Sequence, residues 1–251
     1  MKLVFFKKEF LEFFRTYRFY VLFGVFIFFG LINAPTAKYL PELLKSMPDL
    51  GVTIEMPDPV LTDSYVQYFS NATNAFFALI IIFMGSFSGE IKKGTIYLVL
   101  SKGVPRPDFY FSKLLNAIIM YTIAFAGYTA VTILGTIILF NAWYFKGILA
   151  SVLSIYVLGL LLVSAVLSAS SIARSAGPGA FAGFGLVILL PLTDFLGKAA
   201  PYLPGRLMSL PGRIMSGASM PGDVVLPSLI TLAFMIAAIA ASCLGFYKRE
   251  L

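Results

Sequence analysis

The sequence of 251 residues has no histidine, a single cysteine and few charged side chains, which make up 12% of the chain against roughly a quarter in soluble domains. Without histidine the chain has no Ser-His-Asp triad, no His metal ligand and no His proton shuttle. Cys243 alone excludes an internal disulfide and a thiolate metal cage. The low share of charged residues argues against a water-soluble enzyme, a disordered chain or a nucleic-acid-binding protein. The composition therefore predicts a membrane protein.

Apolar residues make up 59% of the chain and gather in stretches of about 20 residues, the length that crosses the hydrocarbon core. The remainder is too short and too broken up for a soluble domain with its own core. We therefore expect an all-α polytopic membrane protein, with residues 1–251 forming one transmembrane domain. Six spans are predicted, over residues 19–32, 66–87, 114–140, 148–172, 179–196 and 225–247.

The basic residues indicate the orientation of the spans. The net charge of +7 comes from 19 Lys and Arg against 12 Asp and Glu. Most of the Lys and Arg residues flank the spans on the side of the two termini, which the positive-inside rule assigns to the cytoplasm. The loop over residues 34–64 carries several carboxylates and is expected to face outward. An even number of spans agrees with two cytoplasmic termini.

Residues 1–18 are expected to form an amphipathic helix that lies in the cytoplasmic interface and stays in the mature protein. At about 100° per residue, most aromatic side chains of this segment fall within one arc. Lys8, Glu9, Glu12 and Arg15 fall on the opposite side. The rings would then enter the lipid while the charges stay in water. The alternative is a longer first span, which would bring these charges into the apolar core.

The outer segment between spans five and six contains a near-repeat, residues 204–209 followed by residues 211–216. Each copy begins with a Pro-Gly pair, which interrupts helices, and continues with Arg and an apolar pair. Short outer helices are expected here, either re-entrant or interfacial, with Arg206 and Arg213 reaching the headgroups. An amphipathic loop on the surface is the other interpretation.

Polar and small residues within the spans are candidates for packing or for a transport pathway. Gly179 and Gly183 form a G-x-x-x-G pair, which favours close approach of another helix over substrate contact. Asp194, near the outer end of span five, is a candidate pathway residue because acids inside membranes are usually functional. It is alternatively an interfacial acid that pairs with Lys198. Span two adds further pathway candidates, which are alternatively packed or lipid-facing: Asn71, Asn74, Phe76 and Phe77.

The segment between spans two and three is suited to docking a cytoplasmic partner. Thr95 is a reasonable N-cap for a short helix over residues 96–101. Pro105 and Pro107 would end that helix and turn the chain toward span three. A short helix parallel to the membrane, with its charges in water, presents a surface to a soluble protein.

This segment resembles the membrane subunits of type-2 ATP-binding-cassette exporters, the ABC-2 permease family. Such subunits carry a Glu, then Gly-Thr, a Leu-rich run ending in Ser, Pro and Arg, and a Lys that opens the third span. The matching positions are Glu90, Gly94, Thr95, Leu98, Leu100, Ser101, Pro105, Arg106 and Lys113. With the interfacial helix, the six spans and the broken outer segment, the resemblance covers nearly the whole chain. The length of the outer loop over residues 34–64 departs from the family pattern.

The resemblance implies an exporter in the plasma membrane of a prokaryote. Two such subunits, identical or sister chains, would form the pathway, with a separate cytoplasmic ATPase under each. The resemblance assigns the coupling helix to the segment before span three. The chain has no phosphate-binding loop, so it is expected to bind no cofactor and to be no enzyme, while the partner uses ATP and Mg. The residues expected to face the ATPase are Glu90, Lys93, Gly94, Thr95, Leu98, Ser101 and Arg106.

Two other functions remain open from the residues alone. A secondary transporter driven by an ion gradient usually shows an internal repeat and charges near the membrane midplane, and the chain shows no convincing example of either. An intramembrane protease or lipid transferase needs paired acids, a His, or a Ser beside a base. Asp194 is the only intramembrane acid that such an enzyme would have. Membrane lipid is an expected partner in each case, and nucleic acid is not.

Overall fold

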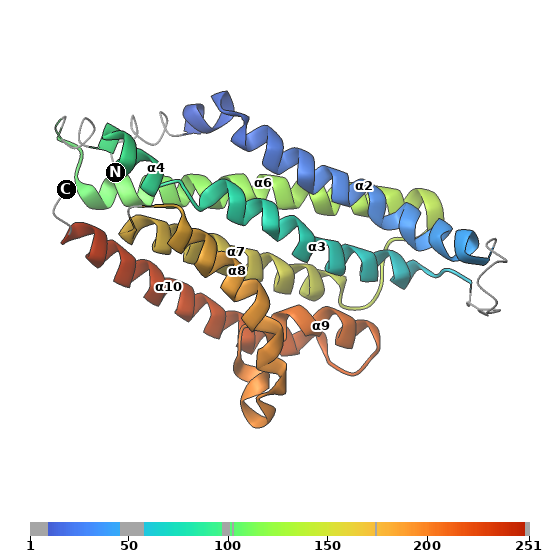
Figure 1. The fold of residues 1–251 in the computed structure, drawn as a ribbon. Helices are drawn as coiled ribbons and strands as arrows, with labels where there is room; N and C mark the ends of the chain where they lie inside the picture. The colour runs from blue at the N-terminus through green and yellow to red at the C-terminus, as the bar shows by residue number, and fades with distance from the viewer. Residues whose placement is uncertain (1–9, 46–57, 97–100, 102, 174, 249–251) are drawn as a thin grey trace.

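The computed structural model describes residues 10–45, 58–96, 101, 103–173 and 175–248, which contain helices and no strand (Figure 1). Within these residues, 6 helices are long and apolar enough to cross a membrane. The predicted all-α fold with six spans is confirmed. The elements are α2 (Tyr17–Lys45), α3 (Leu61–Phe83), α4 (Ser88–Lys93), α6 (Arg106–Phe140), α7 (Ile148–Ile172), α8 (Gly177–Leu192), η2 (Thr193–Phe195), η3 (Gly197–Tyr202), α9 (Arg206–Met215), η4 (Pro221–Val224) and α10 (Val225–Tyr247).

Helix α7 is the centre of the bundle. It contacts α3 and α6 on one side and α8, α9 and α10 on the other, whereas α2 packs on α3 and α6 (Figure 1). Serine side chains along α7 are buried together with its Leu, Ile and Val side chains. Small hydroxyl-bearing residues allow neighbouring helices to approach closely where apolar attraction between helices is weak. All the other spans except α2 therefore pack directly on α7.

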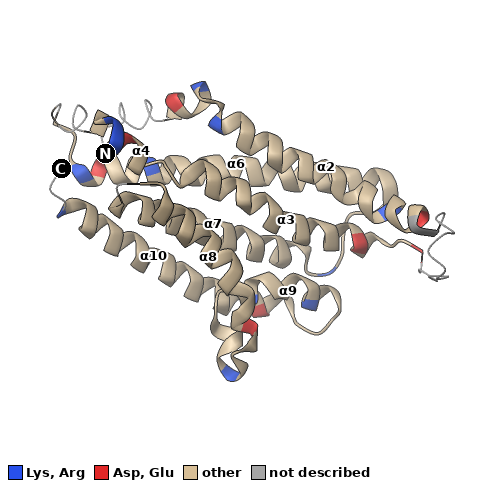
Figure 2. Ribbon diagram, viewed as in Figure 1, with Lys and Arg blue, Asp and Glu red and all other residues tan. Residues whose placement is uncertain are grey.

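Charged residues gather at the two ends of the bundle and around η2 and α9, and leave a belt between them almost free of charge (Figure 2). Burying a charge in hydrocarbon is costly, so this belt marks the apolar core of the membrane. Helix α4, the start of α6 and the end of α10 lie at one end, where Arg106 Nη1 donates a 2.7 Å hydrogen bond to the carbonyl oxygen of Tyr247. We call this the α4 end. Both ends of the described chain lie toward this end of the bundle, as an even number of spans requires.

Two spans are longer than predicted. Helix α2 continues beyond Ile32 to Lys45 with Pro35 inside it, because buried Ala34 packs on α6 and holds the helix across the missing hydrogen bond. Its far end is held by Lys38, whose Nζ donates a 2.9 Å hydrogen bond to the carbonyl oxygen of Leu139. Helix α6 begins at Arg106, since proline is tolerated in the first turn.

The N-terminal segment packs against the bundle with one side and is exposed on the other. Residues 10–15 are helical and a bend at Thr16 separates them from α2, while residues 1–9 of the predicted interfacial helix lie outside the described chain. Phe13 is buried, and its ring stacks on Phe83 with 5.7 Å between centroids. Tyr17 is 84% exposed. The expected common lipid-facing arc is therefore wrong for Phe13, because the end of α3 covers it.

The near-repeat forms one outer helix rather than two equivalent elements. Gly205 precedes α9, whereas Pro211 of the second copy lies inside α9. Leu207, Leu210 and Ile214 are buried, and α9 docks on α7 with this apolar face. Pro211 lies inside α9, where it removes one helical hydrogen bond, and it is buried together with the apolar face of the helix. Contact with the bundle has decided the helix boundaries.

Candidate functional site: the α4 platform

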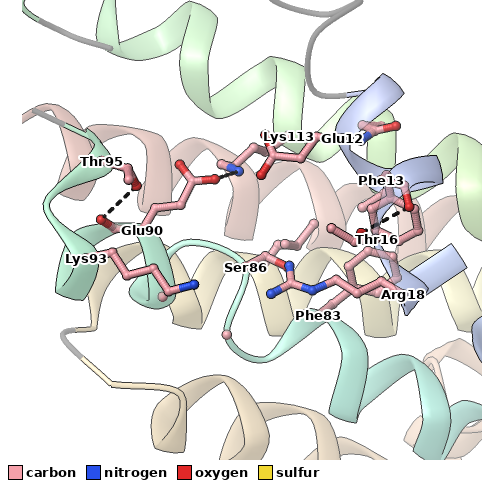
Figure 3. A pocket seen from close by; sticks show the side chains of 15 residues that line it. Glu12, Phe13, Thr16, Arg18, Phe83, Ser86, Glu90, Lys93, Thr95 and Lys113 are labelled. Carbon is pink, nitrogen blue, oxygen red and sulfur yellow. Dashed lines mark hydrogen bonds and ion pairs between the residues drawn. The ribbon is translucent and has the colours of Figure 1, made fainter. Parts of the chain in front are cut away.

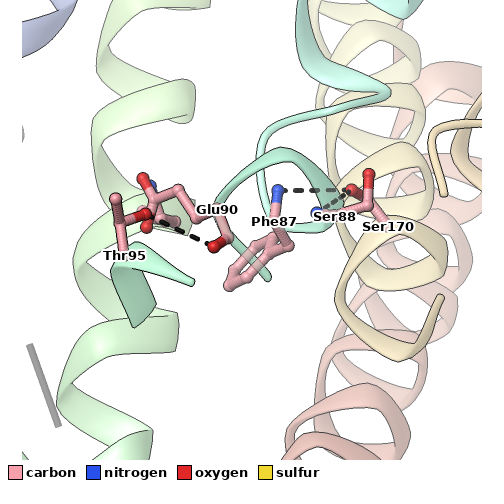
Figure 4. Close-up of polar contacts among 6 residues, drawn as sticks. Phe87, Ser88, Glu90, Thr95 and Ser170 are labelled. Atoms are coloured by element: carbon pink, nitrogen blue, oxygen red, sulfur yellow. Dashed lines mark hydrogen bonds and ion pairs between the residues drawn. The ribbon is translucent and has the colours of Figure 1, made fainter. Parts of the chain in front are cut away.

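The connection from α3 to α6 forms a platform at the α4 end. The chain leaves α3 at Phe83, turns over residues 84–87 and enters α4. The backbone N–H groups of Phe87 and Ser88 donate to Ser170 Oγ on α7, at 3.3 and 3.4 Å (Figure 4). The buried Phe87 ring stacks on Tyr110 with 5.4 Å between centroids. We call residues 84–96 the α4 platform; its first half is anchored to α6 and α7.

An ion pair joins the platform to α6. Lys113 Nζ lies 2.5 Å from Glu90 Oε1, with the Lys113 side chain 9% exposed and that of Glu90 20% exposed (Figure 3). The ammonium group also lies 5.3 Å from the centroid of the Phe109 ring, a distance at which a ring face attracts a cation. A charge so deeply buried needs its partner. Glu90 and Lys113 therefore fix the angle between α4 and α6.

Helix α4 ends at Gly94, whose backbone is left-handed with φ 71°. Glycine takes this conformation without steric cost, which explains Gly-Thr rather than another pair here. Thr95 is itself helical rather than a residue preceding the helix, and its hydroxyl donates a 3.3 Å hydrogen bond back to the Glu90 carbonyl oxygen. Thr95 and Ile96 are helical, as is Ser101, whereas Leu98 lies outside the described residues.

The structure brings most of the predicted coupling residues together. Lys93 and Thr95 are exposed on the platform, Glu90 and Gly94 shape it, and Ser101 is exposed further along the connection. Arg106 ties the start of α6 to the end of α10, and its contact with an ATPase stays a prediction. Sequence reasoning did not single out Ser170. Nothing in the sequence distinguishes it from the other serines of α7.

The predicted pathway residues do not form one surface. Phe76 is buried with its ring against Tyr121, whereas Phe77 is 39% exposed and lies beside Phe184 of α8, 5.9 Å between centroids. Asn71 belongs to a buried polar network, in which its Nδ2 donates a 2.8 Å hydrogen bond to Asn33 Oδ1. The interpretation of Phe76 and Asn71 as packed residues is therefore favoured.

The remaining two candidates lie at separate exposed places. Asn74 is exposed and lines a groove of about 440 Å³ between α3 and α9, beside Met208 and Met215. Asp194 is exposed in η2, and among the described residues it forms no ion pair with Lys198. The suggested Asp194–Lys198 pair is thus absent, while the interfacial position of Asp194 agrees with its structural interpretation.

Removing the Ser170 hydroxyl is expected to loosen the platform without harming the bundle. In Ser170→Ala the two N–H groups of the turn lose their acceptor, at a cost of about 1–2 kcal/mol to local stability. Hydrogen exchange at Phe87 and Ser88 should accelerate by about tenfold. The matched control is Ser164→Ala, because Ser164 bonds only the carbonyl oxygen of Leu160 in its own helix. Equal exchange at the turn in both variants would contradict the anchoring role.

Comparisons with known proteins agree with this architecture. The family described as ABC-2 family transporter protein matches residues 3–202. An uncharacterized transmembrane protein of Bacillus subtilis (strain 168), YxlG, is 28% identical over 207 residues, which cover 80% of each chain. No solved structure matches the chain. Because the family match extends over most of the chain, from the N-terminal segment to η3, this multi-pass membrane protein belongs to the ABC-2 family of transporters.

Proposed function

We propose that this chain is the permease subunit of an exporter and takes its energy from a separate cytoplasmic ATPase. In this proposal the partner binds ATP and Mg and hydrolyses the nucleotide, and the α4 platform receives its movement. The α4 end would face the cytoplasm. Family membership supports a transport subunit, and the anchoring of the platform is the observation that supports the coupling role.

The platform has the mechanical properties that coupling needs. Its outer side carries the exposed side chains of Lys92, Lys93 and Thr95, which suit a hydrated protein surface. Its inner side is held by the Ser170 hydrogen bonds and by the buried Glu90 ion pair. A push on the exposed side is therefore passed to α6 and α7 instead of being absorbed by a loose loop.

The exposed face of α8 supports a permease that works as a pair. Phe181 of α8 is 82% exposed and Phe195 of the following η2 is 85% exposed, so this side of the bundle faces lipid or a second subunit. The scattered pathway candidates fit the same idea, because a passage between two subunits needs only one wall from each. Closure of ATP-bound partners would press on both platforms and reorient α2, α3 and α8 about the dimer axis.

Crosslinking tests whether an ATPase docks on the platform. In a Cys243→Ser background, Thr95→Cys should form a crosslink to a protein that mass spectrometry identifies as an ATP-binding-cassette ATPase. Lys146→Cys is the matched control, since Lys146 is an exposed lysine beyond the end of α6, at the opposite end of the bundle.

The Gly94→Trp variant should insert normally but lose substrate-stimulated hydrolysis, because Trp is strained at positive φ.

The same preparation separates the proposal from an ion-gradient transporter. Transport in vesicles that contain the chain and its ATPase should require ATP. Transport that persists without ATP, and that follows an imposed proton or sodium gradient, would contradict the proposal and favour secondary transport. Asp194→Asn with normal transport would further count against an enzyme that uses this acid.

A further inference from the structure

A cavity of about 400 Å³ opens beside the α4 platform, between the N-terminal segment, the α3–α4 turn and α6 (Figure 3). Three cationic side chains and two carboxylates line it. Lys113 and Glu90 neutralise each other in the ion pair. The other charged side chains of the lining are Glu12, Arg18 and Lys93, so the described lining carries a net positive charge.

Arg18 and Lys93 face one another across the cavity. Their charged ends point toward each other near Ser86 (Figure 3). Within the described part of the chain, neither side chain has a hydrogen bond or an ion pair. Two cations that converge repel each other, and this arrangement is favourable when an anion lies between them. The residues come from different elements, the start of α2 and the end of α4, so the convergence is a feature of the fold.

An apolar groove of about 270 Å³ continues from this cavity along the outside of α2 and α3. Arg18 and Gly85 line both spaces, and Val21, Ile81 and Ile82 line the groove alone. Val21 and Ile81 are more than half exposed. Both lie just inside their spans, beside Tyr17, an aromatic residue of the kind that concentrates at membrane interfaces. The groove therefore starts at headgroup depth and runs into the acyl-chain region.

We propose that this composite site binds one anionic glycerophospholipid, with its phosphate between Arg18 and Lys93 and an acyl chain in the groove of Val21, Ile81 and Ile82. Guanidinium and ammonium groups suit phosphate oxygens. The hydroxyl of Ser86 at the cavity wall is available to the headgroup. The lipid would join the N-terminal segment, α2 and α4 across the cavity. The site shares Lys93 with the residues expected to face the ATPase, but the inference concerns lipid binding to the isolated chain and does not rest on the proposed function.

The phosphate chemistry alone also fits a soluble phosphate ester, and the adjoining groove is the reason to favour a lipid. A free anion would bind only the two cations, and the groove would then be covered by bulk membrane lipid. A bound phospholipid uses both, because its phosphate meets the two cations while its acyl chain packs against the apolar side chains of the groove. Phosphatidylglycerol and phosphatidylcholine with identical chains differ in net charge, so they separate the charge contribution from the groove contribution.

Native mass spectrometry of the purified full-length chain in neutral detergent tests the site. Titration with phosphatidylglycerol should show one tight lipid, bound at least about fivefold more tightly than phosphatidylcholine. Arg18→Gln and Lys93→Gln should each weaken that binding by about fivefold, and Ile81→Trp should weaken both lipids by filling the groove. Lys92→Gln is the matched control, because Lys92 is exposed on the same helix and does not line the cavity. It should leave the affinity within about twofold of the wild type.

Each other outcome contradicts the proposal. Equal losses in Lys92→Gln and Lys93→Gln would mean general attraction to a basic surface. Equal binding of phosphatidylcholine would remove the role of the two cations. Competition by inorganic phosphate or glycerol 3-phosphate at concentrations similar to that of the lipid would assign the cavity to a soluble anion. Arg18 and Lys93 are exposed, so their substitution does not disturb the fold on which the assay depends.

Discussion

Glu90→Gln is expected to lower the stability of the α4 end by about 2–3 kcal/mol and to abolish stimulation of the partner ATPase. The substitution removes the carboxylate partner of the Lys113 side chain, which is 9% exposed, and breaking a buried ion pair by removing one partner is costly. The angle between α4 and α6 is then no longer held. Thermal unfolding in detergent measures the first effect, and substrate-stimulated ATP hydrolysis by the assembled transporter measures the second.

The double variant Glu90→Gln/Lys113→Gln separates the contribution of the ion pair to stability from the cost of leaving one charge buried alone. Two amides of similar volume replace the two charges, so most of the lost stability should return. Lys92→Gln, which removes an exposed charge from the same helix, should change stability by less than about 0.5 kcal/mol. If the double variant is as unstable as Glu90→Gln, the ion pair does not hold the platform.

Gly183→Ala is expected to destabilise the bundle by about 2 kcal/mol, although alanine favours helices over glycine. A Cβ at Gly183 would lie 2.7 Å from Ile80 Cγ1 and 2.8 Å from Val166 Cγ2. These side chains belong to α3 and α7, which are themselves packed. The helices must therefore move apart. Unfolding in detergent, followed by circular dichroism, measures the loss.

Gly185→Ala is the control, because a Cβ there meets nothing within 4 Å on the same helix. This variant should be neutral or more stable by up to about 1 kcal/mol. Ile80→Ala combined with Gly183→Ala should recover part of the loss by making room, beyond the cost of shortening Ile80 alone. Equal stability of the Gly183→Ala and Gly185→Ala variants would show that α8 does not pack closely on α3.

The predicted G-x-x-x-G pair shows what a sequence motif can predict and what it cannot. Its spacing correctly indicates close packing, since a Cβ at Gly179 would lie 2.7 Å from the Met84 carbonyl oxygen. The motif does not name the partner helix, because any span can approach a face of small residues. Only the arrangement of the bundle identifies α3 and α7 as the partners.

The sequence likewise predicts only some features of the α4 platform. The Gly-Thr pair and the basic residues were evident as a pattern, and Gly94 does end α4 with positive φ. In the sequence, Glu90 and Lys113 are only two of the positions that match the family spacing. Nothing in the sequence shows that they contact each other. Ser170 is distant in the sequence and joins the platform through the packing of α7 on α3. A local pattern contains no information about such long-range contacts.

Composition and the apolar runs by themselves determined the class of this protein and its six spans, because hydrocarbon admits only long apolar helices with satisfied backbones. The tertiary structure decided where the spans end, which aromatic residues are covered and which charges meet. Helix α2 passes Pro35 because α6 supports it, and Phe13 is buried because Phe83 lies over it. Lys113 is tolerated in its buried position because the fold places Glu90 beside it. Each of these outcomes depends on contacts between elements, and such contacts exist only once the helices have packed.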